Sequence, residues 1–234
     1  MVYDWINTVQ QQLYPAACIL CGSKGIEGLD LCVSCRDQLP RNLHPCSCCA
    51  LPLPTDNNST LCGHCAAHAP LFQRIYAPFL YLPPMDHLVR GLKFHQQLAN
   101  SRALGKLLAD YLRQQDYKPP QLILPVPLHK RQLRERGFNQ SAELAHQLAR
   151  ELRLAWSTRL LHKIKHTQPQ HGLDRAQRVK NLRRCFQFDN PYGLTHVALL
   201  DDVVTTGSTA NEITRTLKRR GVETVQIWAL ARTP

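Results

Sequence analysis

Several largely apolar runs in the chain predict strands, because such runs are typical of strands buried on both faces of a parallel sheet. We expect the runs to form successive strands of one sheet. The runs lie at residues 75–82, 122–126, 195–200 and 224–230.

Between these runs, apolar residues recur at helical spacing. The spacing over residues 86–113 breaks near residues 92–101 and predicts either two helices or one kinked helix. Further helices are expected at 141–152 and after residue 208, where Thr209 and Glu212 fit a capping box and Gly221 fits a C-terminal stop. Alternating strands and helices predict an α/β fold with a parallel sheet flanked by helices.

The segment after residue 200 combines two acids, several hydroxyls and one glycine. Asp201 and Asp202 stand where the apolar run stops, and we expect both carboxylates to face a ligand rather than the core. Gly207 lets backbone N–H groups approach a phosphate at the start of the following helix. The expected ligand-binding residues are Asp201, Asp202, Val203, Thr205, Thr206, Gly207, Ser208 and Thr209.

This combination favours a phosphorylated sugar, with the loop binding phosphate and the acids binding ribose hydroxyls or Mg²⁺. Two alternatives remain for the segment: an ordinary strand end with solvated acids, or the Walker B strand of a nucleotide hydrolase. The Walker interpretation is disfavoured because the sequence contains no G-x-x-x-x-G-K-[ST] phosphate loop.

A basic segment follows the strand predicted at 122–126 and precedes the helix at 141–152. We expect a basic loop there, which provides a second anion site at the same edge of the sheet. Its candidate pyrophosphate ligands are Lys130, Arg131, Arg134 and Arg136, with Gly137 permitting backbone approach. A solvated run of charges is the alternative.

Positive charge is concentrated in one part of the chain. The formal net charge is +12, and residues 129–184 carry fourteen Lys/Arg against four Asp/Glu, so the rest of the chain contributes only +2. This favours a polyanionic partner. The first residues lack the basic region of a secretory signal, and no apolar run reaches the roughly 18 residues of a membrane span, so we expect a cytoplasmic protein whose cysteines are not in disulfides.

Eight of the ten cysteines form four C-x-x-C pairs. Two such pairs supply the closed tetrahedral S₄ shell of a structural zinc, so the sequence predicts two zinc ions. Sequential ribbons are favoured over a cross-braced site because the two halves look like copies of one unit. Cys48 and Cys185 are left over, and His44, His64 and His68 are expected at the surface. The predicted ligands are Cys18, Cys21, Cys32, Cys35, Cys46, Cys49, Cys62 and Cys65.

Taken together, the cysteine pairs and the segments LVRGLKFH, LPVPLHKRQLRERGFNQ and LLDDVVTTGST resemble the ComF/GntX family of competence-associated proteins. The resemblance implies a type I phosphoribosyltransferase fold over residues 69–234 behind a double zinc ribbon over residues 1–68. It also implies that the loop at 201–209 binds phosphoribosyl pyrophosphate (PRPP) with Mg²⁺. Single-stranded DNA and other competence proteins are the implied partners.

The resemblance leaves two functions open. A binding module would hold PRPP and single-stranded DNA during natural transformation, whereas an active phosphoribosyltransferase would release pyrophosphate from PRPP. Residues 160–184 occupy the position of the family's flexible catalytic loop, where Lys163, Lys165 and His166 are candidate charge stabilisers. No hood for a nucleobase and no catalytic residue is recognisable in the sequence. A regulator that senses PRPP is a third possibility.

Overall fold

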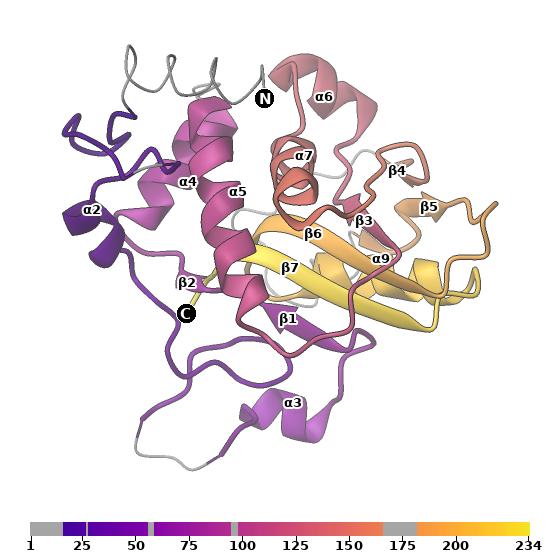
Figure 1. Ribbon diagram of the computed structural model, residues 1–234. Helices are drawn as coiled ribbons and strands as arrows, with labels where there is room; N and C mark the ends of the chain where they lie inside the picture. Colours follow the sequence, from indigo (N-terminus) through magenta and orange to yellow (C-terminus); the bar gives the residue numbers. More distant parts are fainter. Residues whose placement is uncertain (1–15, 27, 56–58, 95–97, 166–181) are drawn as a thin grey trace.

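The computed structural model describes residues 16–26, 28–55, 59–94, 98–165 and 182–234. At its centre lies a parallel sheet whose two longest strands, β6 and β7, pair along nearly their whole length. β2 lies beside β7 beyond the end of β1 (Figure 1). In spatial order the strands are β1 (Arg74–Tyr76) with β2 (Phe79–Leu80), β7 (Thr224–Arg232), β6 (His196–Val204) and β3 (Leu122–Pro125).

Helices cover both faces of the sheet. α4 (Met85–Phe94), α5 (Leu98–Arg113) and α7 (Gln140–Leu152) pack on one face. α9 (Ser208–Lys218) covers the other face together with a separate antiparallel pair, β4 (Leu161–Lys163) and β5 (Phe186–Phe188) (Figure 1).

Alternate residues of β6 explain why the strand must be apolar throughout. Ala198 and Leu200 pack under α4, α5 and α7, whereas Val197 and Leu199 pack under α9, and all four are at most 1% exposed. The expected parallel α/β fold is therefore confirmed. The region at 86–113 forms two helices, α4 and α5, which is one of the two arrangements its spacing allowed.

The basic segment after β3 is a helix, so the prediction of a loop was wrong. α6 (Lys130–Arg136) begins with a capping box in which the His129 side chain accepts from the Arg131 N–H, and the Gln132 side chain accepts from the His129 N–H. An i,i+4 ion pair between Arg131 and Glu135 supports the helix. Gly137 ends it with φ of 82°, a left-handed conformation suited to glycine.

The capping box predicted for α9 was also wrong. The helix begins at Ser208 after Gly207, whose φ is 74°, and no side chain caps it. Glu212 instead accepts the Arg184 N–H at 2.9 Å and pairs with Arg215, so its carboxylate is committed away from the helix start. The expected stop is confirmed, because Gly221 has φ of 91° just beyond the last turn.

The cysteine-rich region contributes two one-turn helices, α2 (Val33–Asp37) and α3 (Gly63–Ala67). Leu31 and Leu39 of the first ribbon belong to the same buried cluster as α4 and α5, and Asp30 accepts hydrogen bonds of 2.6 to 2.8 Å from Arg102 of α5. The division into domains at residues 68 and 69 stays a prediction. Within the described ranges, no helix is long and apolar enough to cross a membrane.

Candidate functional site: two metal centres and a phosphate-binding loop

The eight paired cysteines come together as two groups of four. In each group all the sulfur atoms lie within 4.8 Å of one another, and the groups are Cys18, Cys21, Cys32 and Cys35, then Cys46, Cys49, Cys62 and Cys65. The sequential arrangement is thus confirmed over the cross-braced one. Zn–S bonds of about 2.3 Å place tetrahedral sulfurs roughly 3.8 Å apart. Separations of 3.7 Å for Cys21–Cys32 and 3.6 Å for Cys49–Cys62 fit that geometry.

Each ribbon repeats the same local design around its second cysteine pair. Cys32 caps α2 by accepting the Cys35 N–H, and Cys62 caps α3 by accepting the Cys65 N–H, both at 3.4 Å. Burial opposes ionisation of Cys46, but N–H groups of Cys49, Cys62 and Cys48 outweigh it and lower the pKa of that thiol to about 7. The two groups of four clustered sulfurs fit two structural zinc ions.

The remaining cysteines and nearby histidines lie outside these two groups. Cys48 is half-buried beside the second group, and Cys185 is buried near β5 in the main domain. Within the described part of the chain, the metal-ligand groups contain no histidine, which agrees with a surface role for His44, His64 and His68.

The loop between β6 and α9 forms a pocket at the carboxyl end of the sheet. Six of the eight predicted ligand-binding residues line it, and Thr206 lines an adjoining pocket with Thr205 and Gly207. The Thr206 and Ser208 hydroxyls bond to each other at 2.8 Å, which fixes the turn ahead of α9. The six residues are Asp201, Val203, Thr205, Gly207, Ser208 and Thr209.

The two acids have different environments, so the expectation that both face a ligand was wrong for Asp202. That side chain is 4% exposed and forms an ion pair with Lys93 of α4. The strand also continues past the acids to Val204, because β7 still pairs there after β3 has ended. Asp202 therefore belongs to the packing between sheet and α4, and only Asp201 lines the pocket.

Asp201 accepts the Asp202 N–H at 2.9 Å and the Ser141 hydroxyl at 3.3 Å. Desolvation by burial, and then the like charge of Asp202, raise the pKa of Asp201 to about 8, against the opposing attraction of Lys93. Burial therefore favours the protonated form of Asp201, and a cation bound beside it would favour the carboxylate.

Because α6 is a helix, the residues of the second predicted anion site do not gather in one place. Lys130 lines a pocket of about 410 Å³ together with Lys163 of β4 and Asn139, the N-cap of α7. Burial lowers the pKa of the Lys163 ammonium. Arg136 donates to Gln140 at 2.7 Å, and Arg131 pairs with Glu135. The remaining predicted members of this site are Arg134, which is exposed, and Gly137. Of the other residues predicted for the flexible catalytic loop, Lys165 is exposed and His166 lies outside the described residues.

Known proteins were compared with the chain as a whole. A protein-family model described as a double zinc ribbon domain matches residues 9–66. DNA utilization protein YhgH of Salmonella typhimurium is 35% identical over 94% of this chain and 98% of its own length. Competence protein F of Haemophilus influenzae is 37% identical over 92% of this chain and 96% of its own length. The chain belongs to the ComF family.

Among solved structures, adenine phosphoribosyltransferase from Leishmania tarentolae is 14% identical to this ComF-family chain, with a TM-score of 0.37 over 61% of this chain and 74% of that one. A similarity this low carries no argument about ligand or reaction.

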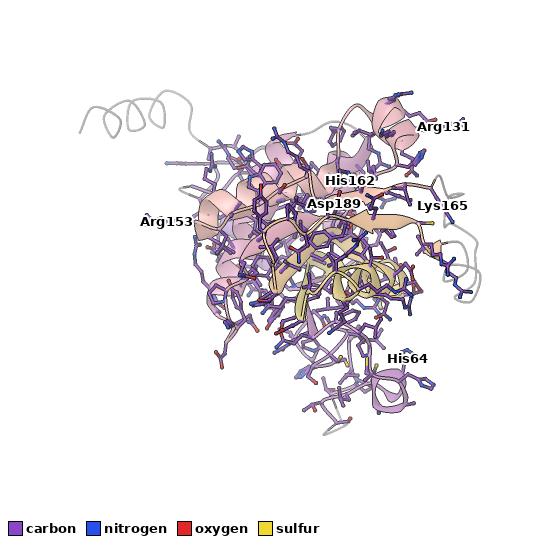
Figure 2. All side chains as sticks on the ribbon, turned by 90° about the vertical axis from the view of Figure 1, so that its right-hand side faces the viewer. His64, Arg131, Arg153, His162, Lys165 and Asp189 are labelled. Atoms are coloured by element: carbon purple, nitrogen blue, oxygen red, sulfur yellow. The ribbon has the colours of Figure 1, made fainter. Side chains whose placement is uncertain are left out.

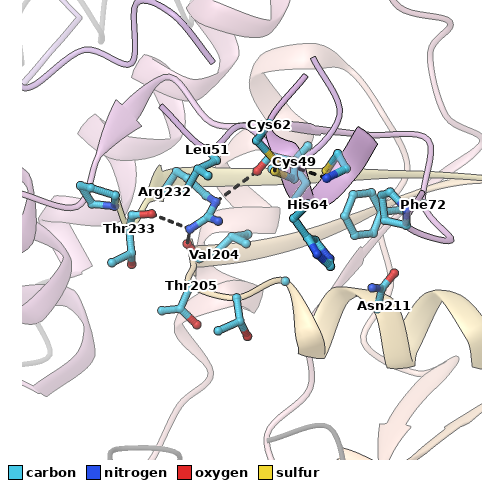
Figure 3. A pocket seen from close by; sticks show the side chains of 16 residues that line it. Cys49, Leu51, Cys62, His64, Phe72, Val204, Thr205, Asn211, Arg232 and Thr233 are labelled. Atoms are coloured by element: carbon cyan, nitrogen blue, oxygen red, sulfur yellow. Dashed lines mark hydrogen bonds between the residues drawn. The ribbon is translucent and has the colours of Figure 1, made fainter. Parts of the chain in front are cut away.

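In this ComF-family member, Arg232 at the end of β7 connects the second ribbon to the loop between β6 and α9. Its guanidinium is buried and donates to the carbonyl oxygens of Cys49 at 3.1 Å, Val204 at 3.3 Å, and Thr233 (Figure 3). A pocket of about 330 Å³ lies beside it, between the ribbon and the loop, with His64 and Phe72 in its wall (Figure 3). The metal-binding region is thus a direct neighbour of the loop.

Sequence reasoning missed Lys93 and Arg232 in the ComF-family chain. Lys93 occurs within the segment LVRGLKFH, where a cation near apolar helix positions was a signal of burial with a partner. Arg232 gave a similar signal at the end of an apolar strand. Neither signal named the partner, because both contacts join segments more than 100 residues apart in sequence.

Proposed function

We propose that the chain binds a phosphoribosyl ligand such as PRPP with Mg²⁺ at residues 201–209, and that it holds single-stranded DNA in the cytoplasm during DNA uptake. The two functions rest on different regions of the molecule. They are therefore tested separately.

The observation that carries the ligand proposal is the pocket that Asp201 lines together with the first residues of α9. Gly207, in its left-handed conformation, leads the backbone directly into the helix, whose first N–H groups and positive dipole end favour phosphate. Carboxylate and hydroxyl oxygens, here those of Asp201, Thr205 and Thr209, suit Mg²⁺, which takes oxygen ligands and retains several waters. Asp201, Thr205 and Thr209 would hold the ion, which would offset the negative charge of a phosphorylated ligand.

Two observations support the DNA proposal: the positive charge of one region and the names of the relatives. The +10 region at 129–184 supplies cations for a phosphate backbone, and the relatives carry the names DNA utilization protein and competence protein. Phosphate contact should matter more than base stacking, because Phe138, Trp156 and Phe186 are the only aromatic residues of the Phe, Tyr and Trp types between 129 and 186.

The ligand proposal is tested by Asp201→Asn, with Asp189→Asn as a matched control at an exposed acid. We expect calorimetry with PRPP and Mg²⁺ to show binding by the wild type and the control, and at least a tenfold loss in Asp201→Asn. Equal affinity in all three proteins would refute the assignment of Asp201. Pyrophosphate release with any nucleobase in the same samples would establish turnover.

Asp201→Asn has a second expected effect that does not depend on ligand. The pKa of Asp201 is higher in the folded chain than the roughly 3.9 of an unfolded one, so the folded state binds the extra proton and its stability falls as pH rises from about 4 towards 8. The amide cannot ionise. The variant should therefore have a higher Tm than the wild type at pH 8 and a smaller difference at pH 5, and a lower Tm at pH 8 would contradict the assigned environment.

A further inference from the structure

A surface cleft of about 360 Å³ lies on the outer side of α9, away from the phosphate-binding loop. One wall is the side of α9 from Glu212 to its C-terminal end, and the other is formed by Arg183 and Arg184, shortly before β5. Besides Glu212, every residue that lines the cleft is an exposed arginine, and the four are Arg183, Arg184, Arg215 and Arg219.

Only part of this charge is balanced inside the cleft. Glu212, 6% exposed, pairs with Arg215 and accepts the backbone N–H of Arg184. Over the described ranges, Arg183, Arg184 and Arg219 take part in no ion pair. The cleft thus presents an excess of three positive charges to solvent.

The backbone at Arg184 is held in an unfavourable conformation that presents its side chain there. Its φ is 56°, in the left-handed region that non-glycine residues seldom occupy. The hydrogen bond of 2.9 Å from its N–H to the buried carboxylate of Glu212 stabilises this conformation. Glu212 therefore positions Arg215 on one wall of the cleft and Arg184 on the other.

The cations continue from the cleft towards α6. Lys163 pairs with Phe186 in the β4–β5 register, and the Ile164 N–H donates to Cys185, so Lys165 and Arg184 emerge at the same end of that strand pair. Lys163, the last residue of β4, shares a pocket with Lys130 of α6. Arg131 and Lys165 lie on the same side of the molecule in Figure 2, with His162 nearer its middle.

We infer that this arginine cleft is a contact site for the phosphodiester backbone of single-stranded DNA, at one end of a cationic track that runs over β4 and β5 to α6. The inference rests on the proposed DNA function and gives it a location. Guanidinium groups match phosphate oxygens with paired N–H donors, and three uncompensated arginines exceed the charge needed for a single phosphate monoester. A track across several elements suits a chain of phosphates.

The test compares Arg183→Ala/Arg219→Ala with Arg150→Ala/Arg220→Ala. Both double variants lose two exposed positive charges, but only the first pair lines the cleft. Arg215 is retained so that Glu212 keeps its partner. Binding of an oligo-dT strand is measured over a salt series, because each lost phosphate contact lowers the slope of log K against log salt by about 0.7 for a single strand.

We expect the cleft variant to lose about 1.4 units of slope, and at least tenfold in affinity at low salt, while the control variant keeps the wild-type slope. Equal slopes in the two variants would overturn the inference and leave the DNA function standing. Absence of oligo-dT binding in the wild type would overturn both. We expect the two variants to have the same affinity for free dTMP. If the cleft bound dTMP but contributed nothing to oligo-dT binding, it would be a mononucleotide site, contrary to the inference.

Discussion

Replacing Lys93 with Met tests how the two adjacent acids of β6 are divided between packing and ligand binding. The Lys93 and Asp202 side chains are 22% and 4% exposed and form an ion pair between α4 and the sheet. Desolvation opposes the charge on Lys93, but the attraction of Asp202 outweighs it and raises the pKa of the ammonium. The ion pair therefore contributes its full stability to the fold at pH values below the unfolded lysine pKa of about 10.4, and this contribution is lost only at higher pH. The stability of the variants should for this reason be measured at neutral pH.

Methionine retains most of the volume of lysine and removes the charge, leaving Asp202 buried without its partner. Breaking a buried pair from one side costs about 3–5 kcal/mol. At about 2–4 °C per kcal/mol for a chain of this size, the Tm should fall by roughly 6–20 °C.

Arg90→Met is the matched control on the same helix. Arg90 is 56% exposed and pairs with Asp86 at the surface, an interaction worth at most about 1 kcal/mol. Adding Asp202→Asn to Lys93→Met should recover part of the lost stability, because it removes the uncompensated charge. Urea unfolding followed by circular dichroism measures all four proteins. If Lys93→Met costs no more than Arg90→Met, Asp202 is not a buried carboxylate, and both acids would again be candidates for the ligand.

Two further predictions concern the metal centres and the loop. Elemental analysis should find two zinc ions in the wild type and in Cys48→Ser but one in Cys46→Ser, since only Cys46 belongs to a four-sulfur group; zinc loss from Cys48→Ser would contradict that ligand set. Gly207→Ala should lower the unfolding free energy by about 1–2 kcal/mol, because φ is 74° and the added Cβ meets no atom within 4 Å, so the cost is purely conformational. Gly63→Ala, also in open space but without a positive φ, should cost less; equal costs would argue against strain at residue 207.

Local patterns were sufficient for the strands, most helices and the cysteine pairs. Val197 to Leu200 had to be buried on both sides because no polar residue interrupts them, and C-x-x-C spacing brings two sulfurs together within one turn. Each of these features depends on residues close in the chain. For that reason the sheet and the metal centres could be predicted without knowledge of tertiary contacts.

The errors arose where a distant segment decided the outcome. Glu212 fits a capping box with Thr209 by spacing, but Arg184 and Arg215 compete for its carboxylate. Asp202 appears equivalent to Asp201 in sequence, yet Lys93 from α4 takes it into the core. The basic residues of α6 led to the prediction of a loop. Its capping residues and its glycine stop are visible in the sequence, so that error was avoidable.

α9 sets a fixed separation between two regions that were described independently. Its first turn adjoins the pocket that Asp201 lines and Arg219 follows its last residue, so the twelve steps from Gly207 to Arg219 span about 18 Å at 1.5 Å per residue. A ligand that touched both ends would have to be as long as about five nucleotides at the 3.4 Å spacing of a duplex strand. A free phosphoribosyl compound is too short to do so, whereas a short piece of DNA is long enough.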